Sequence, residues 1–204
     1  MNFKKKYHSD SYRSQYYAAQ ESYARSLLES IISKNRLPLE VVSLGLTETQ
    51  GIVPDYYSST SNRFDFAIVR KGDRAIVCII EVTGDEEKDR YARILTEKIR
   101  VMERFMDIYM FYQIYVLYLK RTSIGTVKTV KWFGGAQLVD YLKGRGCPDC
   151  YVAKWKEGEK PYLFVKLSYG ITTQQFVAIL KKLPSEIGRL IPRITVDDLV
   201  GFCG

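Results

Sequence analysis

The chain has 204 residues, of which 46% are hydrophobic and 26% charged, and its formal net charge is +8 at pH 7. This balance is that of an ordinary globular protein. The sequence contains no run of about 18 apolar residues, so we predict no membrane-spanning helix. The basic N-terminus is not followed by an apolar signal segment, so we predict an intracellular protein. The positive charge favours a polyanionic partner such as nucleic acid, because each neutralised phosphate releases counterions.

The first third of the chain predicts an arm, a helix and a strand. Residues 1–13 are basic and lack a regular apolar pattern, so we expect a flexible arm. From Ser14 to Lys34 apolar residues recur with helical period, and Pro38 prevents the helix from continuing. Leu39–Leu46 is typical of a strand, and the polar segment up to Arg63 is typical of a loop.

A β-hairpin is predicted next. Phe64–Arg70 and Arg74–Val82 are rich in valine, isoleucine and phenylalanine, and a turn with Gly72 separates them. Every residue of Ala75–Ile80 is apolar, which indicates a central strand that is covered on both faces.

The remaining segments complete an α/β pattern. Asp85–Tyr109 carries an apolar stripe and acidic residues at its start, so it predicts a second helix. The expected elements that follow are strands at Tyr112–Leu119 and Thr126–Phe133, a helix at Ala136–Lys143, a hairpin within 150–167, a helix at Thr172–Leu183 and a helical or irregular end. This order predicts a mixed central sheet flanked by helices.

Two carboxylates bracket the predicted hairpin. Asp65 lies near the start of its first strand and Glu81 at the end of its second, so they should lie close together. Burying both is costly unless a cation compensates, and hard oxygen ligands suit Mg²⁺ or Mn²⁺. In the alternative interpretation, each residue is a strand-end carboxylate that faces water.

A family resemblance begins at these residues. Asp65, followed after a hairpin by Glu81-Val82-Thr83, resembles the signature of the PD-(D/E)XK nuclease superfamily. The chain is most similar to the archaeal Holliday-junction resolvases and to the nuclease-like proteins of spindle-shaped viruses of hyperthermophilic archaea, which would place it in a host cytoplasm. The resemblance implies a restriction-endonuclease-like core at residues 14–120, with a C-terminal extension at 121–204 packed on the same domain.

The resemblance also implies a set of site residues. Asp65, Glu81 and the carbonyl of Val82 would bind the metal ion. Thr83 stands where the family has a lysine, so we expect Lys98, within the apolar stripe of the second predicted helix, to supply the missing charge. A third family carboxylate on the first helix would be Glu21. Glu29 is the alternative, but it lies off the apolar line and beside Arg25.

The function implied is that of a metal-dependent DNA endonuclease that cuts branched DNA, such as Holliday junctions, in replication, recombination or repair, as a homodimer. The expected phosphate contacts are Lys4, Lys5, Lys6, Arg13, Arg63 and Lys71. Three alternatives remain: a catalytically impaired DNA-binding module, which Thr83 favours; a RecB-like exonuclease, whose helical Gln-xxx-Tyr motif is missing here; and a structural protein with no nucleic-acid role.

The cysteines form a separate motif. Cys147 and Cys150 stand in a Cys-Pro-Asp-Cys segment, which is half of a zinc site at most. We expect free thiols or a local disulfide first, and a metal site second.

Overall fold

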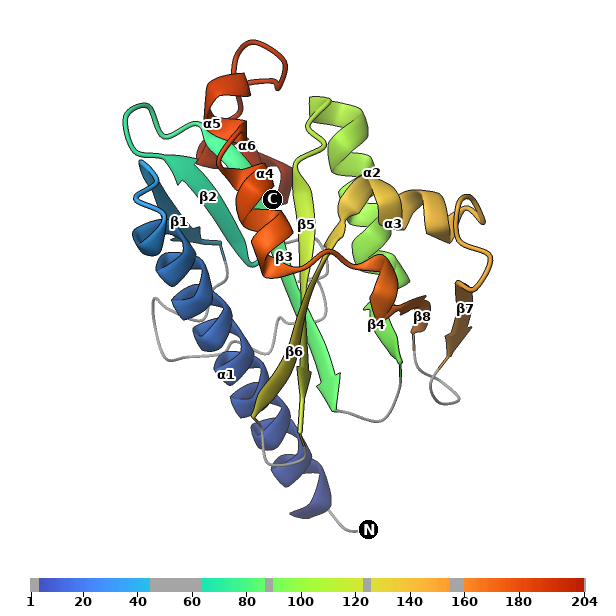
Figure 1. Cartoon of the computed structure of the whole chain (residues 1–204). Coiled ribbons are helices and arrows are strands. Elements are labelled where there is room, and N and C mark those ends of the chain that lie inside the picture. The colour runs from blue at the N-terminus through green and yellow to red at the C-terminus, as the bar shows by residue number, and fades with distance from the viewer. Residues whose placement is uncertain (1–3, 45–63, 87–89, 123–125, 155–159, 204) are drawn as a thin grey trace.

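The computed structural model describes residues 4–44, 64–86, 90–122, 126–154 and 160–203, with the side chains of these residues from Ala19 onward except at 86, 200, 201 and 203. A five-stranded sheet in the order β1-β2-β3-β5-β6 forms its centre (Figure 1). The strands are β1 (Leu39–Ser43), β2 (Phe66–Arg70), β3 (Ile76–Glu86), β5 (Ile114–Arg121) and β6 (Val127–Gly134). Only β3 and β5 pair in parallel; the other neighbours are antiparallel. The expected mixed central sheet is therefore confirmed.

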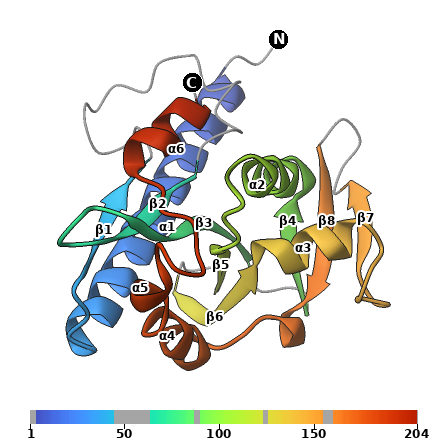
Figure 2. The ribbon, with the colours of Figure 1, turned by 90° about the horizontal axis from the view of Figure 1, so that it is seen from above.

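Helices cover both faces of this sheet (Figure 2). The helices α1 (Lys4–Lys34) and α4 (Thr173–Leu180) lie on one face, and α2 (Thr96–Tyr109) and α3 (Gly135–Leu142) on the other. Successive side chains of β3 point to opposite faces of the sheet, so they meet different helices. Gly84 faces Gln20 of α1, whereas Glu81 faces Lys98 of α2.

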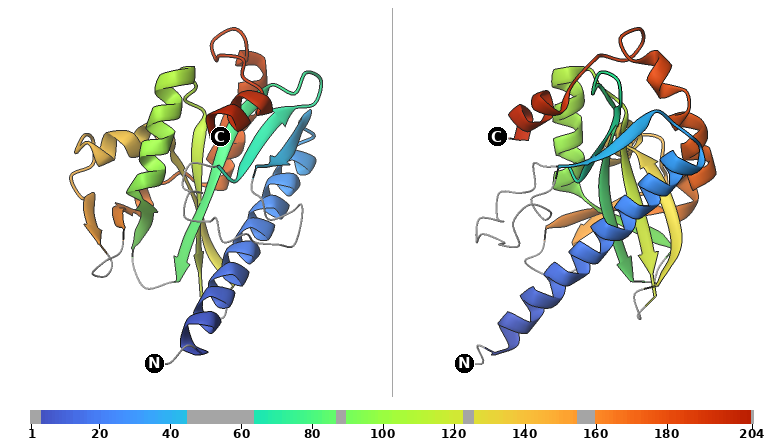
Figure 3. Two further views of the ribbon diagram at one scale, coloured as in Figure 1. Left: turned by 180° about the vertical axis from the view of Figure 1, so that it is seen from behind. Right: turned by 90° about the vertical axis from the view of Figure 1, so that its left-hand side faces the viewer.

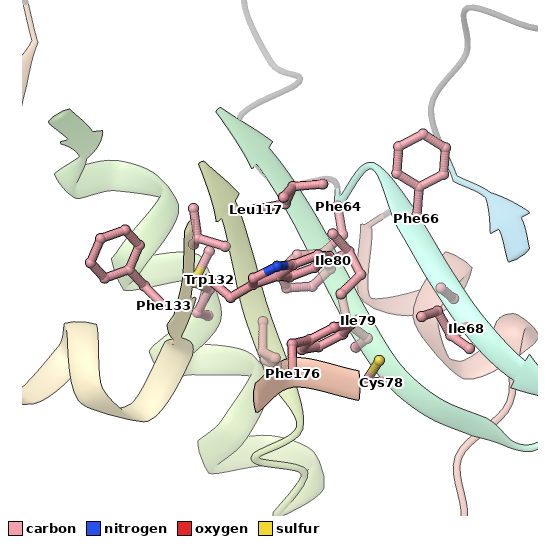
Figure 4. Packing of buried hydrophobic residues seen from close by; sticks show 14 of the residues in the cluster. Phe64, Phe66, Ile68, Cys78, Ile79, Ile80, Leu117, Trp132, Phe133 and Phe176 are labelled. Carbon is pink, nitrogen blue, oxygen red and sulfur yellow. The ribbon is translucent and has the colours of Figure 1, made fainter. Parts of the chain in front are cut away.

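The core is centred on β3. Ala75 and the next five residues are completely buried, which confirms the prediction of a strand covered on both faces. On the α4 face, Trp132 of β6 stacks on Phe176 with ring centroids 3.8 Å apart (Figure 4). Phe176 also packs edge-on against Tyr115 of β5. These contacts fix α4 against the edge of the sheet that is far from β1.

A second sheet corrects the sequence prediction. Asp85–Tyr109 is not one helix, because Asp85 belongs to β3, residues Tyr91–Leu95 form β4, and α2 begins only at Thr96. The strand β4 pairs antiparallel with β8 (Pro161–Lys166), which pairs with β7 (Tyr151–Lys154). Burial alternates along β4, with Ala92 and Ile94 inside. Pairing with a strand about 70 residues away overrode the local helical pattern.

The termini also differ from the sequence expectation. The first helix begins at Lys4, not Ser14, so residues 4–13 of the expected arm are helical, and α1 extends past the sheet (Figure 3). Past β8 lie η3 (Leu167–Tyr169), α5 (Leu183–Glu186) and α6 (Val196–Cys203). Phe202 of α6 packs on Phe105 and Tyr109 of α2. Among the described residues, no helix is long and apolar enough to cross a membrane.

Candidate functional site

The site begins where β2 and β3 stop pairing. The last β2–β3 partners are Phe66 and Ile80, and the Asp65 backbone N–H donates to the Ile80 carbonyl at 3.2 Å. One step further along β3, the Val82 N–H donates to Asp65 Oδ2 at 2.6 Å. The hairpin register therefore brings the Asp65 carboxylate beside Glu81, as the sequence predicted.

Glu81 is almost fully buried and paired with a lysine. Its side chain is 7% exposed, and Glu81 Oε1 lies 2.9 Å from Lys98 Nζ in the first turn of α2. Glu81 Oε2 is buried and accepts no hydrogen bond from any described residue. The expected approach of Lys98 to the carboxylates is observed, although the helix that carries it starts later than predicted.

A third carboxylate reaches the site from α1. Glu21 is half-buried, and its charge acts on both Asp65 and Glu81. Glu29, the alternative, is exposed and binds Arg25 at 2.9 Å on the surface. The geometry therefore favours Glu21 as the acidic residue of the first helix.

Burial raises the pKa values of the two central carboxyls of the site. Burial raises the pKa of Asp65 well above its usual value, and the Glu81 charge raises it further, against the opposing effects of Lys98 and the Val82 N–H. Burial also raises the pKa of Glu81, while the ion pair with Lys98 lowers it. Lys98 therefore offsets only part of the cost of ionising these two buried carboxyls.

The donor chemistry fits Mg²⁺ or Mn²⁺. Carboxylate oxygens of Asp65, Glu81 and Glu21 are hard ligands, and Glu81 Oε2 is a buried acceptor without a donor. No three acidic, histidine or cysteine side chains of the described part are already close enough to hold an ion. The predicted role of the Val82 carbonyl stays a prediction.

Thr83 stands where the motif resemblance leads us to expect a lysine. It lies two residues after Glu81 on β3, so both side chains point to the same face of the sheet. Lys98 approaches Glu81 from α2 on that same face. The Lys98 ammonium group thus lies on the face of the sheet to which a lysine at position 83 would point.

Sequence reasoning missed a polar cluster that continues along this face. Asp85 Oδ2 lies 2.6 Å from Arg93 Nε, and Asp85 Oδ1 is buried without a hydrogen bond within the described ranges. Burial raises the pKa of the adjacent Tyr118 phenol, and the Asp85 charge adds to the effect. Asp85 follows Glu81 by four residues, a spacing that signals one strand face. The helix prediction at Asp85 concealed this.

Of the six basic residues expected to contact phosphate, one has a side chain that the structure describes. Lys4, Lys5, Lys6, Arg13 and Arg63 have side chains outside the described residues. Lys71 is exposed in the β2–β3 turn, at the opposite end of β2 from Asp65. It therefore does not join the carboxylates.

The cysteine motif is a disulfide. Cys147 and Cys150 are bonded to each other just before β7, which selects one of the two leading expectations for this motif. Cys78 of β3 is a buried thiol, and burial raises its pKa.

Comparison with known structures identifies the fold. The chain is similar to a nuclease from a fusselovirus, with a TM-score of 0.52 and 13% identity over 81% of this chain and 90% of that one. A Holliday junction resolvase of the archaeal hyperthermophile Archaeoglobus fulgidus is 9% identical over 78% of this chain and 95% of its own, with a TM-score of 0.39. The sequence matches no family model and no curated protein. The chain therefore shares the fold of the fusselovirus nuclease, in agreement with the expected restriction-endonuclease-like sheet flanked by helices.

Proposed function

We propose that this protein is a metal-dependent deoxyribonuclease that hydrolyses phosphodiester bonds inside branched DNA. The observation that carries the proposal is the meeting of Asp65 and Glu81 at the end of the β2–β3 pairing, with Lys98 Nζ 2.9 Å from Glu81 Oε1. A buried acidic pair with raised pKa values, next to one lysine, is typical of a catalytic site. The fold shared with a viral nuclease supports the same reaction.

Each residue has a distinct role in this proposal. Asp65 and Glu81 hold Mg²⁺ or Mn²⁺, and Glu21 binds a water or second ion beside them. When bound, the ion supplies Lewis-acid stabilisation of the charge on the phosphate and lowers the pKa of water. Lys98 weakens its ion pair with Glu81 when substrate binds. Its ammonium group then positions the attacking water and stabilises the anionic phosphate.

The branched substrate and the homodimer rest on the resemblance to Holliday-junction resolvases. A two-fold symmetric dimer would present two such sites to a junction with matching symmetry. Branched DNA also suits a chain with net charge +8, because several duplex arms bring many phosphates close together.

A second candidate is a DNA-binding module without catalysis. Two observations favour it: Thr83 replaces the motif lysine, and Lys98 already pairs with Glu81. Such a protein would bind DNA with a strong salt dependence and would cut none.

Cleavage assays separate these candidates. The protein would be incubated with a labelled four-way junction, a linear duplex and a single strand, in Mg²⁺, Mn²⁺ or EDTA. We expect cutting of the junction in either metal, and loss of at least about 100-fold in Asp65→Asn and Glu81→Gln. Asp107→Asn is the matched control, since Asp107 is exposed on α2. Binding without cutting would support the inactive module, and equal cutting by all variants would refute the site.

The origin of the catalytic charge has its own test. Lys98→Met should abolish cutting, and adding Thr83→Lys should restore part of it, because a lysine there points to the same face as Glu81. Thr83→Met in the Lys98→Met background controls for side-chain size. Full activity of Lys98→Met alone would show that this lysine has no catalytic role.

A further inference from the structure

The end of the molecule that carries the β2–β3 turn is strongly basic. Three segments meet there: residues 34–40 after α1, residues 70–74 in the turn, and residues 186–193 after α5 (Figure 1). We call this surface the hairpin end. The Lys71 N–H donates to the Pro38 carbonyl at 3.0 Å, and Arg193 lies 3.6 Å from Asp73, so the segments are in contact.

Exposure divides the charges of the hairpin end by sign. Its exposed charged residues are all basic: Lys34, Arg36, Lys71, Arg74, Arg189 and Arg193. Its acidic residues, Glu40, Asp73 and Glu186, are all half-buried. Asp73 is neutralised from within the turn, since Arg70 forms two hydrogen bonds to its carboxylate at 2.8 and 2.6 Å. The outer layer of this surface is therefore cationic.

Two of these arginines occupy backbone positions that favour glycine. Arg36 has φ 51° and Arg74 has φ 57°, in the left-handed region. Arg36 ends α1 in a Schellman motif, in which the Leu37 N–H donates to the Ile32 carbonyl. Arg74 closes the hairpin turn. An arginine at either position costs free energy that glycine or asparagine would avoid, so the backbone does not explain its presence.

Ion pairing does not explain them either. Within the described residues, no ion pair or hydrogen bond of the Arg36 side chain is present, and Arg74 binds only Glu40, at the surface. A surface pair of this kind adds little stability. The Arg36 guanidinium therefore has no bound carboxylate among the described residues, and the Arg74 guanidinium keeps donors that Glu40 does not use for an external anion.

We propose that the hairpin end binds the phosphate backbone of nucleic acid. The ligand class follows from the planar, permanently charged donors of Arg36 and Arg74, which match phosphate oxygens in pairs. Six residue-to-residue steps of extended chain lead from Asp65 to Lys71, or about 20 Å. That distance corresponds to roughly six base pairs at 3.4 Å each. The surface thus contacts either the continuation of the cleaved duplex or a second duplex arm. The inference rests on the proposed function only for this choice of substrate.

The test measures binding in EDTA, so that it does not depend on cleavage. Arg36→Asn and Arg74→Asn, singly and together, remove the charge and retain a residue that tolerates the left-handed conformation. Lys154→Asn is the matched control, because Lys154 is exposed on β7, away from the hairpin end. Fluorescence anisotropy would follow binding to a long duplex and to a four-way junction over a range of salt concentrations.

A plot of log affinity against log salt concentration has a negative slope. We expect the magnitude of this slope to decrease by about 0.9 for each arginine removed and by about 1.8 in the double variant. The thermal midpoint should stay equal or rise, and the double substitution to lysine should restore the slope. Loss on both DNAs would assign the surface to one continuous duplex, and loss on the junction alone to a second arm. A double variant that binds both DNAs as Lys154→Asn does would overturn the inference, even if the wild type cuts DNA. Conversely, a wild type that binds through these arginines and cuts nothing would refute only the nuclease.

Discussion

Replacing Lys98 by methionine should destabilise the metal-free protein by about 3 kcal/mol at neutral pH. The ion pair with Glu81 is 2.9 Å long, and the side chains are 20% and 7% exposed. Removing one partner of a buried pair costs about 3–5 kcal/mol, because an uncompensated charge remains inside. The lower value applies since Lys98 is partly accessible. Glu81 Oε2 has no hydrogen-bond donor among the described residues, so loss of Lys98 would remove the donor that the structure shows for this carboxylate.

Thermal unfolding in EDTA measures this cost. For a chain of this length, a loss of 3 kcal/mol lowers the unfolding midpoint by about 6–12 °C. The double variant Lys98→Met/Glu81→Gln should regain most of the loss, because the buried charge is gone. The cost should also shrink at low pH, where Glu81 is protonated. A midpoint within about 2 °C of the wild type at pH 7 would show that the pair carries no stability and would refute the reasoning.

Three other outcomes follow from the same contacts. The folded-state pKa values of Asp65 and Glu81 are raised above their unfolded values of about 3.9 and 4.3. The native state therefore binds more protons, and chemical denaturation in EDTA should show stability falling as pH rises from about 4 through the raised values; an Asp65→Asn/Glu81→Gln variant that keeps the full slope would contradict this. Mg²⁺ at about 100 times its dissociation constant should stabilise the wild type by about 2.7 kcal/mol and leave Asp65→Asn unchanged; equal stabilisation of both would place the ion elsewhere. Gly84→Ala should cost about 1–3 kcal/mol in urea denaturation, since its Cβ would lie 2.2 Å from the Leu119 carbonyl oxygen. Gly72→Ala, whose Cβ meets nothing within 4 Å, is the control, and equal losses in the two variants would disprove the steric argument.

The central sheet was predictable because its signals are local. The apolar run Ala75–Ile80 and the turn at Gly72 specify a buried strand and its hairpin partner without knowledge of the remaining chain. The strand β4 was not predictable in this way. Ile94 and Leu95 fit a helical stripe that continues into α2, and only pairing with β8 makes Tyr91–Leu95 extended. Short segments that satisfy both periods are decided by distant partners.

The carboxylates of the site were predictable from their places in the hairpin, whereas the lysine was found by an argument that was partly wrong. The sequence prediction places Lys98 on the apolar stripe of one helix that spans Asp85–Tyr109, whereas the part of that stripe at Ile94 lies in strand β4. Lys98 nevertheless faces Glu81, because the first turn of α2 begins beside β3 on that side of the sheet. Asp85 and Arg93 escaped the sequence argument because their ion pair joins a strand end to a segment predicted as helix.

The position of the site follows from unequal strand lengths. β3 continues to Glu86 alongside β5, whereas its pairing with β2 ends at Ile80. From Glu81 onward, β3 thus lacks a neighbouring strand on the β2 side within the described residues. Its backbone groups there need other partners, and the Asp65 carboxylate accepts the Val82 N–H. A hairpin with strands of equal length would satisfy that N–H with a carbonyl and would leave no place for a second carboxylate. The mismatch in length is therefore what allows the Asp65 carboxylate to lie beside the buried Glu81 of β3.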